Sequence, residues 1–231
     1  MRIAIVGRGR MGRAVAARAE ARGHTVQALL GREDVAGGAL TAERLAGADV
    51  AIEFTGPDAA AANIRQLVSL GIPTVVGTTG WEARLPEIED LVRERRGALL
   101  YAANFSIGVQ LFLRAAAVLA LELAGREEFE GLIVEEHHAA KRDAPSGTAR
   151  VLQRAARAAD ASREYPITSI RAGAIPGLHA LRYEGAWESL ALTHSARSRD
   201  GFAAGAVAAA EWLPGRVGVY TFEQMLFGRD S

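Results

Sequence analysis

The first hundred residues alternate short apolar runs with segments of helical periodicity. The apolar runs predict buried strands over residues 2–6, 25–30, 49–54, 74–76 and 98–101. The intervening periodicity predicts helices over residues 12–21, 58–69 and 86–95. This alternation is typical of a doubly wound parallel sheet, in which ligands bind at the carboxyl ends of the strands. We therefore expect Gly7, Thr55, Gly77 and Asn104 along one edge of a sheet.

The pattern changes after residue 105. A long helix over 107–124 leads into a strand over 128–136, a helix over 147–159, and strands over 167–172 and 190–195. The tail is helical from 201 to 212 and then apolar over 217–226. The predicted fold is an α/β, Rossmann-type doubly wound domain plus a second α+β domain with an open mixed sheet. We expect residues 1–105 in the first domain, with 205–231 returning to it, and residues 106–204 in the second.

Composition excludes several classes of function. The chain has no cysteine, so disulfides, thiolate metal sites and thiol catalysis are excluded. Basic and acidic residues balance at 27 each, so no net charge attracts nucleic acid or an anionic membrane. The apolar stretch over 107–124 is interrupted by Gln110, Arg114 and Glu122, and no signal peptide is apparent at the start. We expect a soluble, cytoplasmic protein whose partners include neither nucleic acid nor a membrane.

A single lysine, Lys141, stands among 27 basic residues, and the other 26 are arginine. GC-rich coding accounts for the missing lysines but not for the one that is present. Arginine and lysine exchange freely on solvated surfaces, whereas only lysine offers a compact ammonium group whose pKa shifts when it is buried. Lys141 is therefore a candidate for chemistry.

A glycine-rich loop follows the first strand and opens the first helix. Its sequence has GxGxxG spacing, which is typical of a turn that admits the pyrophosphate of a dinucleotide to the helix N-terminus. A structural glycine turn is the alternative. The loop residues expected at the cofactor are Gly7, Arg8, Gly9, Arg10, Met11 and Gly12.

The end of the second strand bears on the choice of dinucleotide. Gly31 stands where NAD-specific sites usually carry a carboxylate, and Arg32 is able to pair with a 2′-phosphate. Arg32 as an ordinary surface residue is the alternative, and Glu33 or Asp34 could instead bind a 2′-hydroxyl. We expect NADPH to be preferred, with NADH possible. The ends of the fourth and fifth strands should meet the nicotinamide half of the cofactor through Gly77, Thr78, Thr79, Ala102, Ala103, Asn104 and Phe105.

Residues 135–148 hold the densest group of chemically active side chains. His137 and Lys141 offer a proton donor with a pKa near neutrality and a localised cation, which suit reduction of a carbonyl-like or imine substrate. Ser146 or Thr148 caps a following helix whose free amides suit a carboxylate. The alternatives are a metal-binding histidine pair and a solvated loop with a helix cap. Adjacent histidines point in different directions and no third ligand is evident, so we expect no metal.

These residues resemble the dihydrodipicolinate reductase (4-hydroxy-tetrahydrodipicolinate reductase) family. The family signature E-x-H-x-x-x-K-x-D-x-P-S-G-T-A is matched throughout residues 135–149. The resemblance extends through the glycine loop, FTGPD at 54–58, GTTG at 77–80, AANFSIGV at 102–109, residues 169–173, His179 and residues 193–206.

The resemblance implies hydride transfer from a nicotinamide to a cyclic, unsaturated dicarboxylate in the diaminopimelate route to lysine. It implies a homotetramer assembled through the substrate domain. His137 would be the proton donor and Lys141 a second donor or electrostatic stabiliser. The residues that would hold the substrate are His138, Ser146, Gly147 and Thr148. Many members carry an acidic residue at the position of Gly31 and use either cofactor, so its absence here argues against efficient use of NADH. A reductase of another imine or carbonyl acid, and a non-catalytic NADP-binding sensor, are the alternatives.

Overall fold

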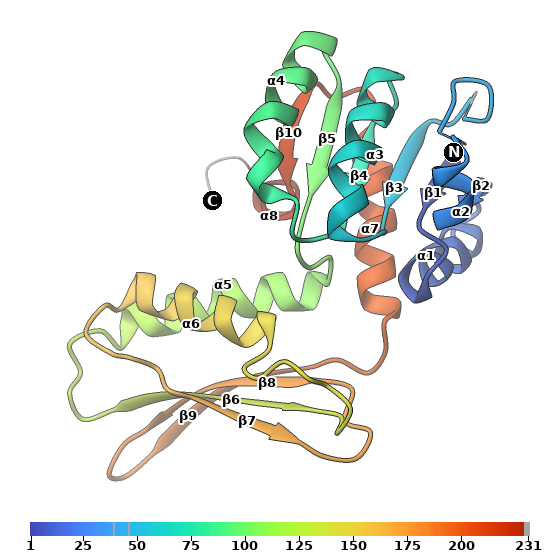
Figure 1. Ribbon diagram of the computed structural model, residues 1–231. Helices are drawn as coiled ribbons and strands as arrows, with labels where there is room; N and C mark the ends of the chain where they lie inside the picture. The colour runs from blue at the N-terminus through green and yellow to red at the C-terminus, as the bar shows by residue number, and fades with distance from the viewer. Residues whose placement is uncertain (39, 46, 229–231) are drawn as a thin grey trace. The chain divides into compact units, whose positions relative to one another are not determined.

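The computed structural model describes residues 1–38, 40–45 and 47–228 (Figure 1). The chain forms two compact units. Unit 1 comprises Met1–Ile107 together with the segment from Arg199 onward, and unit 2 comprises Gly108–Ser198. Within the described part of the chain, no helix is both long and apolar enough to cross a membrane.

Unit 1 is built on a parallel sheet of six strands in the order β10-β5-β4-β3-β1-β2. The strands are β1 (Arg2–Val6), β2 (Thr25–Leu30), β3 (Val50–Glu53), β4 (Thr74–Val76), β5 (Ala98–Tyr101) and β10 (Gly218–Thr221). The helices are α1 (Arg10–Ala21), α2 (Arg32–Ala36), α3 (Pro57–Ser69), α4 (Leu85–Arg95), α7 (Asp200–Trp212) and α8 (Phe222–Phe227), with a 3₁₀ turn at Glu82–Arg84.

Both faces of this sheet are packed, which explains why its strands read as continuous apolar runs. Ile3 and Ile5 of β1 pack in one cluster with residues of α1 and α7. Ala4 and Val6 belong to a second cluster that includes Leu67 of α3. Four of the five strands predicted from the first hundred residues have the predicted bounds, and β3 is shorter by one residue at each end. The Rossmann-type fold predicted from the sequence is confirmed.

The C-terminal segment completes unit 1. Helix α7 packs against α1, and Arg22 at the end of α1 forms a two-point ion pair with Glu211 of α7, at 2.7 and 2.8 Å. The apolar run at 217–226 divides into β10, which pairs in parallel with β5, and helix α8. Thr221 separates the two because its side chain caps the helix by accepting a hydrogen bond from the amide of Gln224.

Unit 2 places two helices against a four-stranded sheet of order β7-β6-β8-β9. Its elements are α5 (Ile107–Glu122), β6 (Glu130–His137), α6 (Gly147–Ala159), β7 (Ile167–Arg171), β8 (Leu178–Glu184) and β9 (Ser189–Ser195). Strands β6 and β7 are parallel, whereas β8 is antiparallel to both of its neighbours, so the predicted mixed sheet is confirmed. The sequence analysis did not identify β8 or helix α2.

Gly205 gives a direct test of the packing in unit 1. A Cβ atom added to this helical glycine would lie 1.8 Å from the carbonyl oxygen of Phe105, whereas one added to Gly201 of the same helix would meet nothing within 4 Å. Gly205→Ala should therefore destabilise the protein by about 1–3 kcal/mol, the usual cost of overpacking. Gly201→Ala should be neutral or slightly stabilising, because alanine favours helix. Urea unfolding checks this, and equal stabilities of the two variants would contradict it.

Candidate active site

The glycine loop between β1 and α1 has the geometry of a phosphate-binding turn. Gly7 has φ of +119°, and a Cβ atom there would lie 1.9 Å from the carbonyl oxygen of Phe54. A Cβ atom on Gly12 would lie 1.7 Å from the carbonyl oxygen of Gly7. Gly9 is the N-cap of α1, makes no side-chain capping bond and has open space where a side chain would stand. The loop therefore gives a ligand close access to the helix N-terminus, and these residues fit a dinucleotide pyrophosphate.

The loops after β4 and β5 lie at the carboxyl edge of the same parallel sheet. Gly77 leaves room for the ring of Phe54, because a Cβ atom added to Gly77 would lie 2.0 Å from that ring. Thr78 is buried and Thr79 is exposed. Phe105 is buried against the rings of Phe54 and Phe222, so its side chain is part of the core. Only its backbone, with the partly exposed residues Ala102, Ala103 and Asn104, is available to a ligand.

Arg8 of the glycine loop extends to the end of β2. Its guanidinium would lie 2.9–3.2 Å from a Cβ atom on Gly31, so a side chain at this position would have to displace the guanidinium. Arg8 Nη2 lies 3.5 Å from a carboxylate oxygen of Glu33 and 3.7 Å from one of Asp34. Asp34 also accepts a hydrogen bond of 2.7 Å from the amide of Gly31. Glu33 and Asp34 thus hold an arginine beside Gly31, while Arg32 is exposed at the start of α2.

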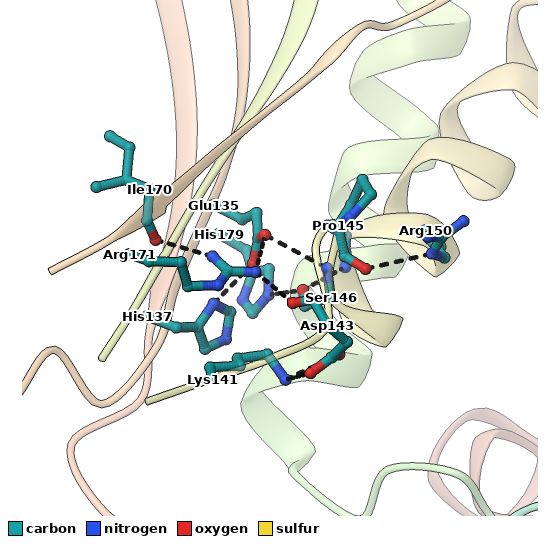
Figure 2. Close-up of polar contacts among 11 residues, drawn as sticks. Glu135, His137, Lys141, Asp143, Pro145, Ser146, Arg150, Ile170, Arg171 and His179 are labelled. Atoms are coloured by element: carbon teal, nitrogen blue, oxygen red, sulfur yellow. Dashed lines mark hydrogen bonds and ion pairs between the residues drawn. The ribbon is translucent and has the colours of Figure 1, made fainter. Parts of the chain in front are cut away.

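In unit 2, the carboxylate of Glu135 connects several elements (Figure 2). Glu135 has no exposed surface, and its Oε1 accepts hydrogen bonds from Arg171 Nη2 at 2.6 Å and from the amide of Ser146 at 3.3 Å. Burial alone would raise the pKa of Glu135. Hydrogen bonds from Arg171, Ser169 and Ser146 outweigh burial and lower this pKa to about 2. The group is therefore an anion at neutral pH.

His137 ends β6 beside this carboxylate. Its Nδ1 lies 2.7 Å from Oε2 of Glu135, without the alignment of a hydrogen bond, and the two groups form an ion pair when the imidazole is protonated. Burial lowers the pKa of His137, and the positive charges of Lys141 and Arg171 add to this effect, while Glu135 opposes it. The residue is 8% exposed, and its ring packs edge to face on that of His179 at a centroid distance of 5.1 Å. It is therefore a shielded imidazole with an adjacent anion.

Lys141 lies in the turn that follows β6. Its ammonium donates to both carboxylate oxygens of Asp143, at 2.7 and 2.9 Å, and this contact lowers the pKa of Asp143. Arg171 Nη2 donates to the carbonyl oxygen of Asp143 at 2.6 Å, which fixes the same turn from β7. The partly exposed His138 accepts a backbone hydrogen bond from the Lys141 amide. The chain's one lysine is thus held near His137 by local contacts.

Ser146, and not Thr148, is the N-cap of α6. Its hydroxyl accepts a hydrogen bond from the amide of Ala149 at 3.2 Å and lies 3.0 Å from Nε2 of His179. Ser146 is 2% exposed as a residue, so its hydroxyl is engaged inside the unit. Gly147 and Thr148 follow at the start of the helix, and Gly147 has open space at its Cβ position. These two residues give an anion access to the helix N-terminus.

The sequence shows no third ligand beside the adjacent histidines His137 and His138, but the fold brings a group of potential ligands together around His137. Strand β8 brings His179 opposite Glu135, and ligand atoms of Glu135, His137 and His179 lie within 4.8 Å of one another. Two of these side chains already have other partners, since Glu135 binds Arg171 and His179 contacts Ser146. A guanidinium beside the carboxylate also opposes a second cation. The arrangement fits a hydrogen-bonded network better than a metal centre.

Sequence reasoning gave no role to Glu135, Arg171 or His179. All three fall inside segments that carry the family resemblance, but their meeting depends on strand register. Arg171 pairs with His137 across β6 and β7, and His179 pairs with Glu135 across β6 and β8. Burial lowers the pKa of His179 to about 4, with a further contribution from His137, so this ring is neutral at neutral pH.

Unit 1 has the fold and glycine loop of a pyridine-nucleotide-binding domain, and unit 2 carries a buried acid–base cluster beside a helix N-terminus. Together they define a two-domain, pyridine-nucleotide-dependent reductase. The chain belongs to the dihydrodipicolinate reductase family. The model of the family's N-terminal domain matches residues 1–105, and that of its C-terminal domain matches residues 108–226.

Relatives match nearly the whole chain. The 4-hydroxy-tetrahydrodipicolinate reductase of Christiangramia forsetii is 36% identical over 98% of both chains. That of Natronomonas pharaonis is 36% identical over 96% of this chain and 99% of its own. Among solved structures, the dipicolinate-bound dihydrodipicolinate reductase from Paenisporosarcina sp. TG-14 superposes with a TM-score of 0.81 at 22% identity, covering 97% of this chain and 99% of that one. This last likeness supports the fold.

The low pKa of His179 makes stability depend on pH. The unfolded chain takes up a proton at this histidine near pH 6.5, whereas the folded chain does so only near pH 4. The protonation of His179 therefore does not affect the free energy of unfolding above pH 6.5. This free energy falls as the pH drops from 6.5 toward 4. In His179→Gln, the loss of unfolding free energy between pH 7 and pH 4.5 should be smaller by roughly 2 kcal/mol. Urea unfolding at both pH values measures this, and an unchanged loss would contradict it.

Proposed function

We propose that the protein reduces 4-hydroxy-tetrahydrodipicolinate to tetrahydrodipicolinate with NAD(P)H, in the diaminopimelate route to lysine. One observation carries the proposal. In a chain of this family, the buried imidazole of His137 and the only lysine, Lys141, lie in one cluster with the N-terminus of α6. A proton donor, a compact cation and an anion site are the three groups that reduction of an unsaturated dicarboxylate requires.

The cofactor supplies a hydride when bound. Its pyrophosphate would be held by residues 7–12 and the N-terminus of α1, and its nicotinamide half by the strand-end residues 77–79 and 102–105. The glycine positions described above leave space for a backbone approach at the first of these sites.

In the substrate domain, His137 donates the proton and Lys141 stabilises charge. The 4-hydroxyl group of the substrate leaves as water and gives an unsaturated ring. Hydride addition to this ring leaves negative charge on the neighbouring carbon, which must then be protonated. The pKa of His137 is lowered in the free protein, but two substrate carboxylates nearby would raise it and so favour the protonated donor. Glu135 supports the same imidazolium from the other side. The ammonium of Lys141 would lower the barrier by facing the developing charge.

The substrate carboxylates are assigned to His138 and to the backbone amides of Gly147 and Thr148. Ser146 acts beside them, because its buried hydroxyl caps α6 and sets the direction of the helix N-terminus. A helix N-terminus carries partial positive charge and free amide donors, which match a carboxylate.

Oxidation of NADPH in the presence of freshly generated 4-hydroxy-tetrahydrodipicolinate tests the proposal. We expect a loss of nicotinamide absorbance that depends on both compounds. NADPH binding without oxidation would instead identify a sensor. Oxidation that occurs only with a different cyclic imine or carbonyl acid would identify a related reductase.

Lys141→Arg tests whether the site needs a compact ammonium. The planar guanidinium of arginine would misplace the charge or collide with the substrate ring, so kcat should fall by at least roughly a hundredfold. His137→Gln should also lower kcat strongly. Both variants should keep the wild-type dissociation constant for NADPH, because the proposed cofactor residues lie in unit 1. Turnover and NADPH fluorescence on the same preparations measure the two effects.

The neighbouring Arg142 provides the control, since it is exposed and its exchange for lysine should leave kcat unchanged. Near-normal turnover in Lys141→Arg would mean that the lone lysine is an accident of composition.

We propose that NADPH is preferred because two arginines, Arg8 and Arg32, lie at the end of β2, where Gly31 carries no carboxylate. Arg8→Ala and Arg32→Ala should each raise KM for NADPH more than KM for NADH. The loss should be at most a few kcal/mol, the scale of charge-assisted hydrogen bonds to a phosphate. Arg8→Ala should have the larger effect, because Glu33 and Asp34 already hold its guanidinium beside Gly31.

Comparison of kcat/KM for both cofactors checks this preference. Arg13→Ala, an exposed change on α1, is the matched control and should alter neither KM. Equal kcat/KM values for NADPH and NADH in the wild-type protein would refute the proposed preference.

We propose further that the protein acts in the cytoplasm as a homotetramer joined through unit 2. In this unit α5 and α6 lie over one face of the sheet. The strand alternation directs several apolar side chains to the opposite face, where no described helix of the unit lies: Leu132, Val134, Ile170, Leu178 and Ala180. Such a face favours contact with a second copy. Light scattering should give four times the chain mass, and a monomer at micromolar concentration would contradict this.

A further inference from the structure

A second buried carboxyl group lies in unit 1, at the carboxyl end of β3. Glu53 has no exposed surface, and in the described part of the chain no lysine, arginine or histidine forms an ion pair with it. Its register neighbours at the ends of β1 and β4 are Val6 and Val76, which are buried and apolar. Burial of an unpaired carboxyl group is costly, and a valine or isoleucine would avoid that cost. Packing of the sheet therefore does not explain this residue.

The Glu53 carboxyl connects the loops that follow two neighbouring strands. The hydroxyl of Thr55 donates to Glu53 Oε1, and the Asn63 side chain of α3 donates to the same oxygen at 3.3 Å. Asn63 also donates to Thr55 Oγ1 at 3.3 Å. The amide of Thr55 donates to Thr78 Oγ1 at 2.8 Å, so the loop after β3 is joined to the loop after β4.

The environment of Glu53 favours its neutral form. Burial raises the pKa of Glu53, and the hydrogen bonds from Thr55, Thr78 and Asn63 offset this only in part. The second oxygen, Oε2, is buried and makes no hydrogen bond to any described residue. The contacts of the carboxyl group thus converge on Oε1, which Thr55 and Asn63 share.

We propose that Glu53 is a positioning residue for the cofactor, acting through Thr55 and Thr78. It holds the loop after β3 against the loop after β4, and the loop after β4 is the one that receives the nicotinamide half. The inference rests on the proposed function, because it takes residues 77–79 as part of the cofactor site. It adds a residue that contacts neither cofactor nor substrate. Its predicted effect is on the affinity of the free protein for the dinucleotide.

Titration calorimetry with NADPH on the purified full chain tests this inference without any need for turnover. Glu53→Ala removes the oxygen that Thr55 and Asn63 share, and the dissociation constant for NADPH should rise about tenfold, equivalent to the loss of roughly one net hydrogen bond to a charged or buried group. Glu53→Gln keeps an acceptor oxygen and the side-chain length, so it should restore the dissociation constant to within about twofold of wild type. The KM for the dicarboxylate should not change in either variant.

Thr74→Val is the matched control. Thr74 is equally buried, and its hydroxyl bonds to the carbonyl oxygen of Ile72 at the opposite end of β4. Thr74→Val should have a lower free energy of unfolding than the wild-type protein, but it should keep the wild-type dissociation constant for NADPH. If Glu53→Ala does not fold, Asn63→Ala replaces it, because it removes an amide that holds both Glu53 and Thr55 from α3. It should weaken NADPH binding about threefold.

The outcomes separate this inference from the proposed function. If the wild-type protein does not bind NADPH, the proposed cofactor site is wrong. If the wild type binds NADPH and Glu53→Ala binds it equally well, Glu53 is structural and the inference is overturned. The same conclusion follows if Glu53→Ala and Thr74→Val weaken binding equally, or if the replacement Asn63→Ala leaves binding unchanged.

Discussion

The contact between the Glu135 carboxylate and Arg171 determines how the rest of unit 2 can be arranged. A carboxylate without exposed surface is stable only when cationic and polar donors surround it. Arg171 of β7 and the amide of Ser146 supply those donors, and the same carboxylate faces His137. Because Arg171 also binds the carbonyl of Asp143, this contact fixes the turn that carries Lys141. Removal of either partner would leave the other charge buried and unpaired.

The two neighbouring histidines of unit 2 have different roles in the proposed chemistry. His137 and His179 are neighbouring imidazoles whose pKa values are both lowered by burial, but they have different contacts. His179 faces the cap of α6 and keeps the helix start in place, whereas His137 faces an anion that favours its protonation. Unit 1 contains a comparable buried carboxyl group, that of Glu53. Its hydrogen-bond donors are a hydroxyl and a side-chain amide, whereas Glu135 has a cationic donor. Both units thus use a buried carboxyl group to order the ends of strands.

The sequence was sufficient to predict the elements whose local residue pattern has a single physical explanation. Buried parallel strands read as apolar runs, so β1, β2, β4 and β5 were predicted with their bounds. The start of α6 was also predicted, although Ser146 and Thr148 were both candidates for its cap. It was insufficient where function depends on register. His179 lies on β8, which was missed, and nothing in the local pattern shows that it faces Glu135. Likewise, Arg8 was assigned to the glycine loop, and its approach to Gly31 appears only when β1 and β2 are paired.

The role of Glu135 is open to one direct measurement, the NMR titration of the His137 ring in the wild-type protein and in Glu135→Gln. Burial lowers the pKa of His137, while the charge of Glu135 opposes that effect. Loss of this charge should therefore lower the pKa of His137 further below its ordinary value near 6.5. An equal or higher pKa in Glu135→Gln would contradict the account, because it would mean that the buried carboxylate does not support a proton on His137.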